Sequence, residues 1–148
     1  MLFRVCKIEN TYLICSRNGK ILRYHKYQKK WTVVKENDCK YLQMKIDGKM
    51  YKMHRVIAHA FGILDLHSEL LIDHIDLKKN NCISNLRPAT PQQNMFNTNA
   101  KGYSWHIQHQ KWNAKIGVNN KRIHLGYFDT EEEAHQKYLE AKKIYHIL

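Results

Sequence analysis

The sequence predicts an α+β fold with an N-terminal β-rich segment, a central β-β-α motif and a C-terminal three-stranded antiparallel sheet packed on one helix. Three observations predict it. Residues 1–53 contain short apolar segments separated by Asn-Gly and Asp-Gly pairs, which are hairpin signals. In the centre, two short apolar runs precede a Thr-Pro pair that typically opens a helix. Residues 101–148 repeat the pattern of short strands and end in a helical segment. We therefore expect two domains, residues 1–97 and 101–148.

The first 53 residues are expected to form two hairpins and one further strand. Asn18-Gly19 and Asp47-Gly48 are predicted to be two-residue turns, because both positions of each pair tolerate a positive φ. Apolar and polar side chains alternate in the second hairpin, as in a strand with one buried face. Lysines and tyrosines crowd the other positions, which suits either a surface along a phosphate backbone or a solvated face. The expected strands are 12–15, 20–24, 31–34, 41–46 and 49–53.

Residues 53–62 change to a helical period. Apolar residues recur at helical spacing and a glycine ends the run, so we expect one short helix that packs against the sheet. His54 and His59 lie on this helix. Lone histidines on a short helix are more often packing or surface residues than ligands, so we assign neither to the site. Arg55 is a candidate phosphate contact.

The central motif is expected to bring polar side chains to one point. An apolar strand over residues 70–72 places Asp73 and His74 at its end. A second short strand, residues 83–86, follows an Asn-rich turn. The Thr-Pro pair then caps and opens a helix, since Thr is a good N-cap and Pro is favoured at the first helical position. The side chains expected to converge in this motif, residues 70–97, are Asp73, His74, Asn85 and Asn94.

This string of residues resembles the HNH nucleases, in the His-Asn-Asn variant found among phage and intron-encoded homing endonucleases. That family folds the segment as a ββα-metal motif around one divalent ion. The resemblance implies that His74 is the general base and that Asp73 and Asn94 are the protein ligands of the metal. It also implies that Asn85 is structural and ties the ribbon loop. Family members often have Gly near Leu77, and the ribbon turn here is one residue shorter.

The chemistry of phosphodiester hydrolysis suits the same residues. It needs a base that titrates near neutrality, and an unperturbed histidine does so at about pH 6.5. Oxygen ligands from Asp and Asn suit one Mg²⁺ (or Mn²⁺) ion per site, which keeps most of its water ligands. Arg87 leaves the second strand beside the proposed centre, where it either clamps the scissile phosphate or pairs with Asp76 to hold the ribbon. Each residue alone would suit a strand end, a cap or a turn; their joint spacing favours a catalytic site.

The C-terminal unit follows a polar linker, residues 97–100. Thr130 and Glu133 have the spacing of a capping box for a helix that runs to about His146. One helix covers a single face of such a small sheet, so we expect the opposite face to be free. The expected strands, separated by His-Gln and Asn-Asn turns, are 102–107, 111–117 and 121–125.

Three strings of this unit, around Lys101, Lys111 and Arg122, resemble the DNA-binding domain of plant ethylene-response factors. Related domains are often fused to phage HNH nucleases. In that family the sheet enters the major groove, and its exposed face reads bases and holds phosphates. Several of the family's arginines are replaced here by Ser, His or Lys. Core packing is the alternative for one of Trp105 and Trp112. By position, the resemblance implies DNA contacts from Lys101, Ser104, His106, Trp112, Lys115, Arg122 and His124.

Charge and composition indicate the partner and the compartment. The formal net charge is +12, and residues 1–60 carry 14 Lys or Arg against 4 acidic residues, which suits a polyanion such as double-stranded DNA or, alternatively, simple solubility. The four cysteines form no close pair, so we expect reduced thiols and no structural zinc. No apolar stretch approaches the roughly 20 residues that span a bilayer, and the N-terminus lacks a signal-peptide core. A cytoplasmic protein, encoded by a phage or acting on the nucleoid of its host, is expected.

These features predict a metal-dependent DNA endonuclease that cuts at a recognised site, of the homing or mobile-element type. A single centre cuts one strand per encounter, so a monomer is expected to nick and a homodimer to break both strands. The alternative is a DNA-binding regulator with an inactive HNH-like centre. An RNA-binding protein fits the charge but not the metal constellation.

Overall fold

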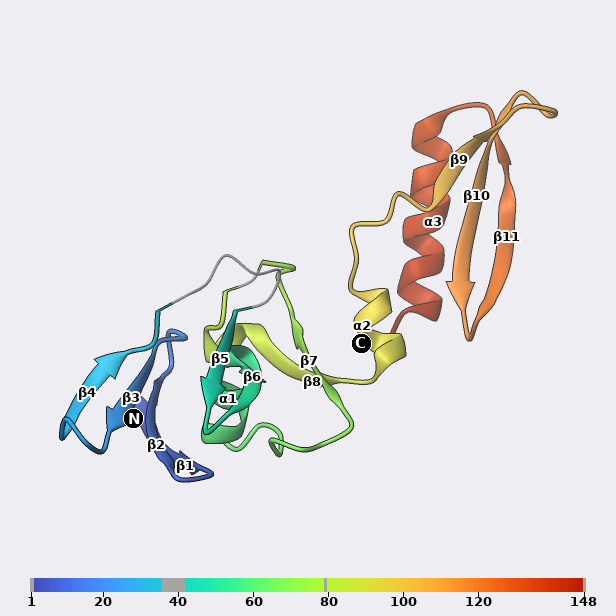
Figure 1. Ribbon diagram of the computed structural model, residues 1–148. Helices are drawn as coiled ribbons and strands as arrows, with labels where there is room; N and C mark the ends of the chain where they lie inside the picture. Colours follow the sequence, from blue (N-terminus) through green and yellow to red (C-terminus); the bar gives the residue numbers. More distant parts are fainter. Residues whose placement is uncertain (1, 36–41, 79, 148) are drawn as a thin grey trace. The chain divides into compact units, whose positions relative to one another are not determined.

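The computed structural model describes residues 2–35, 42–78 and 80–147 of the chain (Figure 1). The chain divides into two compact units, Met1–Thr90 and Pro91–Leu148. Each unit combines small antiparallel sheets with short helices, so the mixed α/β class expected from the sequence is confirmed. The division falls before the helix of the central β-β-α motif, whereas we expected the boundary after that helix, at residues 97–101.

The first unit begins with a four-stranded antiparallel sheet in the order β1-β2-β3-β4. Three of its strands match the expected ones. The first was not predicted, although Phe3 and Val5 alternate with Arg4 and Cys6 as strand residues do. The strands are β1 (Phe3–Ile8), β2 (Thr11–Ser16), β3 (Ile21–His25) and β4 (Lys30–Val33).

The two predicted hairpin turns differ in length. In the hairpin of β5 (Gln43–Ile46) and β6 (Lys49–Lys52), Asp47 and Gly48 both have a positive φ and form the expected two-residue turn. The turn between β2 and β3 is instead three residues long, and Gly19 alone of these described residues has a positive φ. The backbone nitrogen of Ser16 donates to the carbonyl of Lys20 and the Ser16 hydroxyl accepts from the Lys20 backbone nitrogen, both at 2.9 Å, so residues 17–19 form the turn. Tyr41, at the start of the expected fourth strand, lies outside the described residues.

The core of the first unit joins the sheet, the helix and the central ribbon. Leu13, Cys15 and Ile21 cover the inner face of the sheet, and Val56 and Ile57 of α1 (Met53–Ala60) pack on them. The predicted helix is thus confirmed. The same cluster includes Ile72 and Leu86 of the ribbon. Burial of these side chains stabilises the unit by roughly 1.5–3 kcal/mol each, and it fixes the end of the ribbon against the helix. Among the described cysteines, Cys6, Cys15 and Cys82 are free thiols, and Cys39 lies outside the described residues.

The outer face of the first sheet is apolar at its centre. Strand pairing aligns Val5, Ile14, Leu22 and Val33 across all four strands on this face. Val5 and Val33 are 62% and 61% exposed. We expected lysines and tyrosines to occupy the outward positions of these strands. Apolar side chains, and not lysines, form the centre of this face. Exposed aromatic side chains flank it at Phe3, Tyr12 and Trp31.

The central ribbon pairs β7 (Leu71–His74) with β8 (Leu86–Ala89). The second strand begins three residues later than we expected, because Ile83–Asn85 form a 3-10 turn instead. The backbone nitrogen of Asn85 donates to the carbonyl of Cys82 at 2.9 Å and closes that turn. The first strand ends at His74, as expected.

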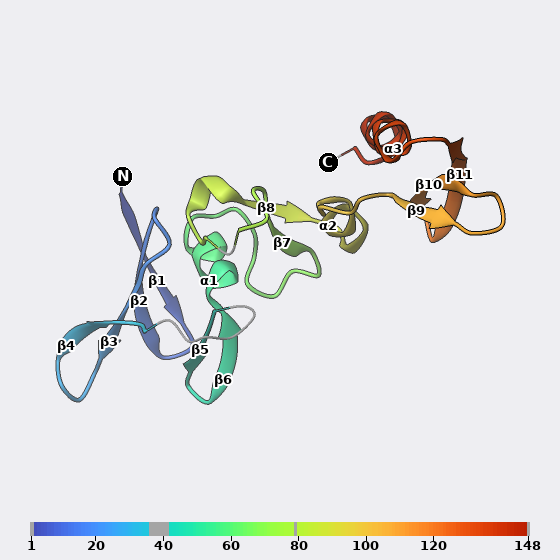
Figure 2. The ribbon, with the colours of Figure 1, turned by 90° about the horizontal axis from the view of Figure 1, so that it is seen from above.

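The second unit contains the predicted three-stranded sheet, in the order β11-β10-β9, and one long helix, α3, on one face. Figure 2 looks along α3, which lies to one side of the strands. Ile116 packs on Tyr138 and Ala141 of the helix. The capping box of Thr130 and Glu133 is confirmed. Among the described residues, no helix is long and apolar enough to cross a membrane. The elements are α2 (Pro91–Phe96), β9 (Tyr103–His106), β10 (Lys111–Val118), β11 (Lys121–Phe128) and α3 (Glu131–Tyr145).

Candidate active site and nucleic-acid face

Asp73 and His74 are the last two residues of β7, and both are buried. Their exposed fractions are 5% and 8%. Strand pairing sets Asp73 opposite Arg87 and His74 opposite Leu86. Ile72, the residue before them, belongs to the hydrophobic core, so the strand end is held firmly. A buried carboxylate beside a buried imidazole needs polar partners, because burial of an unsatisfied polar group is costly.

The partners of His74 come from the turn after β7 and from α1. Its Nε2 nitrogen lies 3.1 Å from the amide oxygen Oδ1 of Asn81, which is also buried. The ring of His54 stands edge-on to the ring of His74, with 5.1 Å between centroids. Burial, with smaller contributions from the neighbouring His74, Lys52 and Arg55, lowers the pKa of His54 to about 4. Neither His54 nor Asn81 was predicted to belong to the site, because helical spacing alone does not reveal which strand a helix faces.

Asp73 is held by Arg87 from the paired strand. The Nε and NH2 groups of Arg87 both donate to Oδ2 of Asp73, at 3.0 and 2.8 Å. The alternative we gave for Arg87, a pair with Asp76, is therefore wrong. The Asp76 carboxylate accepts from the backbone nitrogen of Lys78 instead, at 2.9 Å. Direct pairing of residues 73 and 87 in the register accounts for the choice, since cross-strand partners have adjacent Cβ atoms.

Asn85 spans the turn between the two strands of the ribbon. Its Oδ1 accepts from the backbone nitrogen of Asp76 at 2.9 Å, and its Nδ2 donates to the carbonyl of Asn80 at 2.9 Å. Its own backbone carbonyl accepts from Ile75. These bonds tie the two ends of the turn together, which is the geometry that a brace requires. Within the turn, Leu77 has a φ of 61°, a conformation that favours glycine.

Arg55 has a structural role that the sequence did not suggest. Its guanidinium donates to the backbone carbonyls of Leu66, at 2.6 Å, and Leu70, at 2.9 Å, and also to that of Ser68. The contact of Arg55 with phosphate stays a prediction. These bonds fasten the loop that leads into β7 to helix α1.

A divalent ion at Asp73 would depend on oxygen donors. Asp73 belongs to the first unit and Asn94, on α2, to the second, so their convergence stays a prediction. Within residues 2–35, 42–78 and 80–147, no three His, Cys, Asp or Glu side chains gather as a metal-binding group. A buried carboxylate with an amide oxygen is a donor set that fits Mg²⁺, because this ion takes few protein ligands and keeps its waters.

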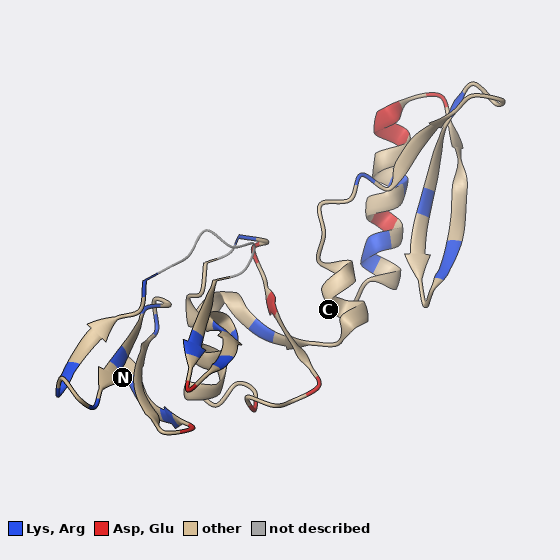
Figure 3. Cartoon of the chain, viewed as in Figure 1, with Lys and Arg blue, Asp and Glu red and all other residues tan. Residues whose placement is uncertain are grey.

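The face of the second sheet opposite α3 carries most of the predicted DNA contacts. Strand pairing sets Lys111 opposite His106 and Lys115 opposite His124, and these positions alternate with the buried Ala114 and Ile116. Lys and Arg residues mark β10 and β11 in Figure 3, whereas acidic residues gather at the start of α3. We call this surface the open face. The predicted DNA contacts that lie on it are Ser104, His106, Lys115, Arg122 and His124.

Two of the predicted contacts do not lie on the open face. Trp112 shares the helix-side face with Ala114 and packs edge-on against Trp105, at 5.3 Å between centroids. Strand alternation thus places it on the side away from the open face, and its contact with DNA stays an untested prediction. Lys101 precedes β9, and its ammonium lies over the ring of Tyr103. The sequence missed Tyr127, whose exposed ring lies between His106 and His124 on the open face, at 5.2 and 4.7 Å between ring centroids.

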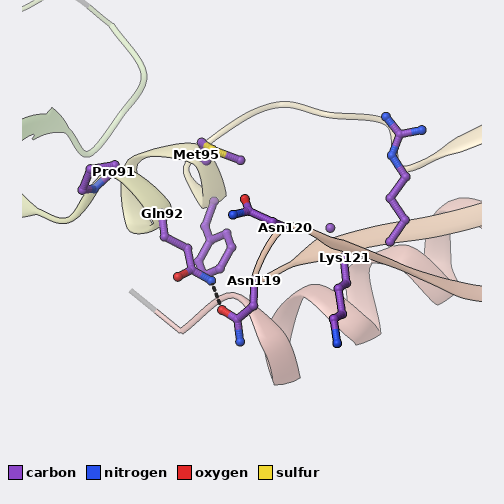
Figure 4. A pocket seen from close by; sticks show the side chains of 9 residues that line it. Pro91, Gln92, Met95, Asn119, Asn120 and Lys121 are labelled. Carbon is purple, nitrogen blue, oxygen red and sulfur yellow. Dashed lines mark hydrogen bonds between the residues drawn. The ribbon is translucent and has the colours of Figure 1, made fainter.

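Helix α2 packs on the turn between β10 and β11, where a pocket of about 410 Å³ opens (Figure 4). Gln92 of the helix donates to the side chain of Asn119. Phe96 stacks on His146 with 3.9 Å between ring centroids. Lys121 and Arg122 line the other wall of the pocket. The helix that carries Asn94 is therefore anchored to the sheet that carries the open face.

Comparison with known proteins finds a similar sequence and a similar solved structure. No protein-family model matches the chain. It is 40% identical over 96 residues to a protein of Acanthamoeba polyphaga mimivirus named "Uncharacterized HNH endonuclease L560". The match covers 62% of this chain and 50% of that protein, so the chain spans about half the length of the curated relative it matches. Over the matched region the two are homologous.

A solved structure, entitled "DNA binding and cleavage by the HNH homing endonuclease I-HmuI", resembles the chain with a TM-score of 0.44 at 22% identity. The superposition covers 84% of this chain and 76% of the other.

Proposed function

We propose that this protein is a metal-dependent endonuclease that hydrolyses phosphodiester bonds of double-stranded DNA at a recognised site. The observation that carries the proposal is the buried Asp73-His74 pair at the end of β7, braced by Asn85 across the turn. Homology to a protein named as an HNH endonuclease supports it. We further propose the homing or mobile-element type, action in the cytoplasm, and a monomer that nicks or a homodimer that breaks both strands.

His74 is the proposed general base. It takes the proton of the water that attacks phosphorus, and the water oxygen forms the new bond as the bond to the leaving oxygen breaks. An imidazole suits this task because its ordinary pKa lies near neutrality. His54, kept neutral by burial, lies against the base without adding a positive charge that would oppose its protonation.

Asp73 and Asn94 are the proposed holders of one Mg²⁺ or Mn²⁺ ion. When bound, such an ion supplies positive charge to the non-bridging and leaving oxygens of the phosphate. Arg87 keeps the Asp73 carboxylate in place through two hydrogen bonds to one oxygen. Its side chain is 27% exposed, so a role in binding the scissile phosphate is also compatible with its position.

The open face of the second unit is the proposed DNA-binding surface. Lys115, Arg122 and His124 project from adjacent strands on that face. Their spacing suits phosphates and base edges in a groove, and lysine and arginine contacts to phosphate supply affinity that falls with salt. Lys101 and Arg87 are the remaining proposed DNA contacts.

The test is cleavage of supercoiled and linear DNA, drawn from a random-sequence library, with Mg²⁺, Mn²⁺ or a chelator. The wild type is compared with His74→Ala and with His59→Ala, a histidine variant elsewhere on α1. We expect His74→Ala to reduce cleavage by roughly 10²–10⁴-fold while DNA still shifts in a gel. His59→Ala should cut normally. A wild type that shifts DNA and leaves it intact with every metal would instead make the protein a DNA-binding regulator.

A further inference from the structure

Asn81 is placed to set the orientation of the proposed base. Its amide oxygen lies 3.1 Å from Nε2 of His74. Asn81 is 7% exposed and His74 8%, so solvent hardly competes for this contact. A buried hydrogen bond that is shielded from water holds its geometry better than an exposed one. The hydrogen bond therefore restricts the position of Nε2, and with it the orientation of the His74 ring.

The chemistry of the amide oxygen decides where the imidazole proton lies. A carboxamide oxygen can only accept a hydrogen bond, so Nε2 must carry a proton to bond with it. A neutral imidazole has one ring proton, which leaves Nδ1 as the basic nitrogen. We infer that Asn81 is a positioning residue, which fixes His74 in the Nε2-protonated form and directs Nδ1 to the attacking water. The role of Nδ1 rests on the proposed function, whereas the position of the proton does not.

The β2–β3 turn of the N-terminal sheet holds Asn81 in place. A Cβ added to Gly19 would stand 2.8 Å from the carbonyl carbon of Asn81 and 3.0 Å from its Cβ, so the two backbones touch. Beside this contact, the backbone nitrogen of Ile83 donates to the carbonyl of Arg17 at 2.8 Å. The N-terminal sheet is thus a support for the catalytic turn, and the three-residue length of the β2–β3 turn brings Gly19 to that position.

The two neighbours of Asn81, Asn80 and Cys82, are also fixed by hydrogen bonds within the ribbon. The carbonyl of Asn80 accepts from Nδ2 of Asn85, and the side chain of Asn80 accepts from the backbone nitrogen of Cys82 at 2.7 Å. Asn81 therefore lies between two anchored residues. The ring of His54, at right angles to the ring of His74, also limits its rotation. The base is held at Nε2 by Asn81 and is packed against His54.

The proton position can be measured without any cleavage. Two-bond nitrogen–proton correlation spectra of ¹⁵N-labelled protein distinguish the two neutral forms of histidine, at about pH 8 where an ordinary imidazole is neutral. His74→Ala identifies the His74 signals. We compare two substitutions of similar size: Asn81→Asp, which still accepts a hydrogen bond, and Asn81→Leu, which does not. Wild type and Asn81→Asp should carry the proton on Nε2, and Asn81→Leu should show a mixture.

Cleavage kinetics provide the second measurement. Asn81→Leu should lower kcat by about 10–100-fold with KM nearly unchanged, as for other residues that orient a site ligand or base. A matched pair guards against misfolding. Gly19→Ala pushes on Asn81, whereas Gly48→Ala meets no described atom within 4 Å although both glycines have similar φ values of 89° and 86°. Gly19→Ala should disturb the His74 spectrum and kcat, and Gly48→Ala neither.

The outcomes separate the two proposals. A wild-type His74 with its proton on Nδ1 overturns the inference whether or not DNA is cut, because Asn81 would then present its NH2 group. An Asn81→Leu variant with an unchanged proton position also overturns it. If the proton lies on Nε2 and shifts in Asn81→Leu while the protein cuts no DNA, the proposed nuclease function fails and the control of the imidazole by Asn81 stands.

Discussion

Arg87 and Asp73 face each other across the two strands of the central ribbon, and Arg87 places two hydrogen bonds on a single carboxylate oxygen. The carboxylate is almost fully buried and the guanidinium is partly exposed. The pair therefore keeps a negative charge inside the fold at the position where a divalent cation is proposed. Ion pairs of this kind contribute little on the surface, but loss of one partner is costly when the other is buried.

Replacement of Arg87 by Met should destabilise the protein by about 2 kcal/mol. Met keeps much of the aliphatic stem and removes the charge, so the loss reports the contact with Asp73. The free energy of unfolding is measured by urea denaturation, in a double-mutant cycle with Asp73→Asn. In the Asp73→Asn background the cost should fall below about 1 kcal/mol, because the buried charge is gone. Equal costs in the two backgrounds would show that the pair contributes nothing.

Substitution of Leu77 by Gly should stabilise the fold by about 0.5–1 kcal/mol. Leu77 has a φ of 61°, which strains any residue with a Cβ, and its side chain is 41% exposed, so little burial is lost. Part of the gain is offset by the larger entropy of glycine in the unfolded chain. The midpoint of urea denaturation is the measurement.

The control for this prediction lies two residues earlier in the same turn. Ile75 is a similarly exposed apolar residue that has no positive φ. Ile75→Gly should therefore destabilise the protein by about 1 kcal/mol. If Leu77→Gly lowers the midpoint as far as Ile75→Gly does, the strain at Leu77 is not relieved by glycine.

Local signals in the sequence predicted the C-terminal end of β7 and the start of α2, since an apolar run and a Thr-Pro pair depend on neighbouring residues alone. The role of Asn85 as a brace was implied by the resemblance to HNH nucleases and not by local signals. The contacts around the site follow from pairing between distant segments. The register of the ribbon selects Asp73 as the partner of Arg87, and the length of the β2–β3 turn brings Gly19 to Asn81. Neither is encoded in local periodicity.

The same limit applies to the helix α1 and to the second sheet. Helical spacing gave the length of α1, but the partners of His54 and Arg55 come from β7 and from the loop before it. Alternation along β10 was visible in the sequence, yet a choice of side for Trp112 required knowledge of which face α3 covers. Lys115 alternates with the buried Ala114 and Ile116, so its exposure follows from the pattern of the strand, while its contact with DNA stays a prediction.

Stability should depend on pH through His54. Burial lowers its folded pKa to about 4 from an ordinary value of 6.5. Between these values the unfolded chain binds a proton that the folded chain does not, so stability is complete above about pH 6.5 and falls as the pH drops towards 4. The loss from this group is up to about 3 kcal/mol. Urea denaturation across this range measures it, and His54→Gln should flatten the dependence. A dependence that is the same in both proteins would assign the loss to other groups.

DNA binding by the open face should depend on salt through Lys115. This residue is exposed on β10, opposite His124, and its charge is well placed for a phosphate. Each phosphate contact releases about one counterion, so Lys115→Ala should weaken binding and reduce the slope of log K against log salt by about 1. Fluorescence anisotropy over about 50 to 200 mM salt gives the slope.

The matched control is Lys137→Ala on α3, where the ammonium is 3.3 Å from Glu140. Since Lys137 does not lie on the open face, its removal should leave the slope unchanged. Equal effects of the two substitutions would mean that DNA responds to net charge alone, and the open face would then have no special part in binding.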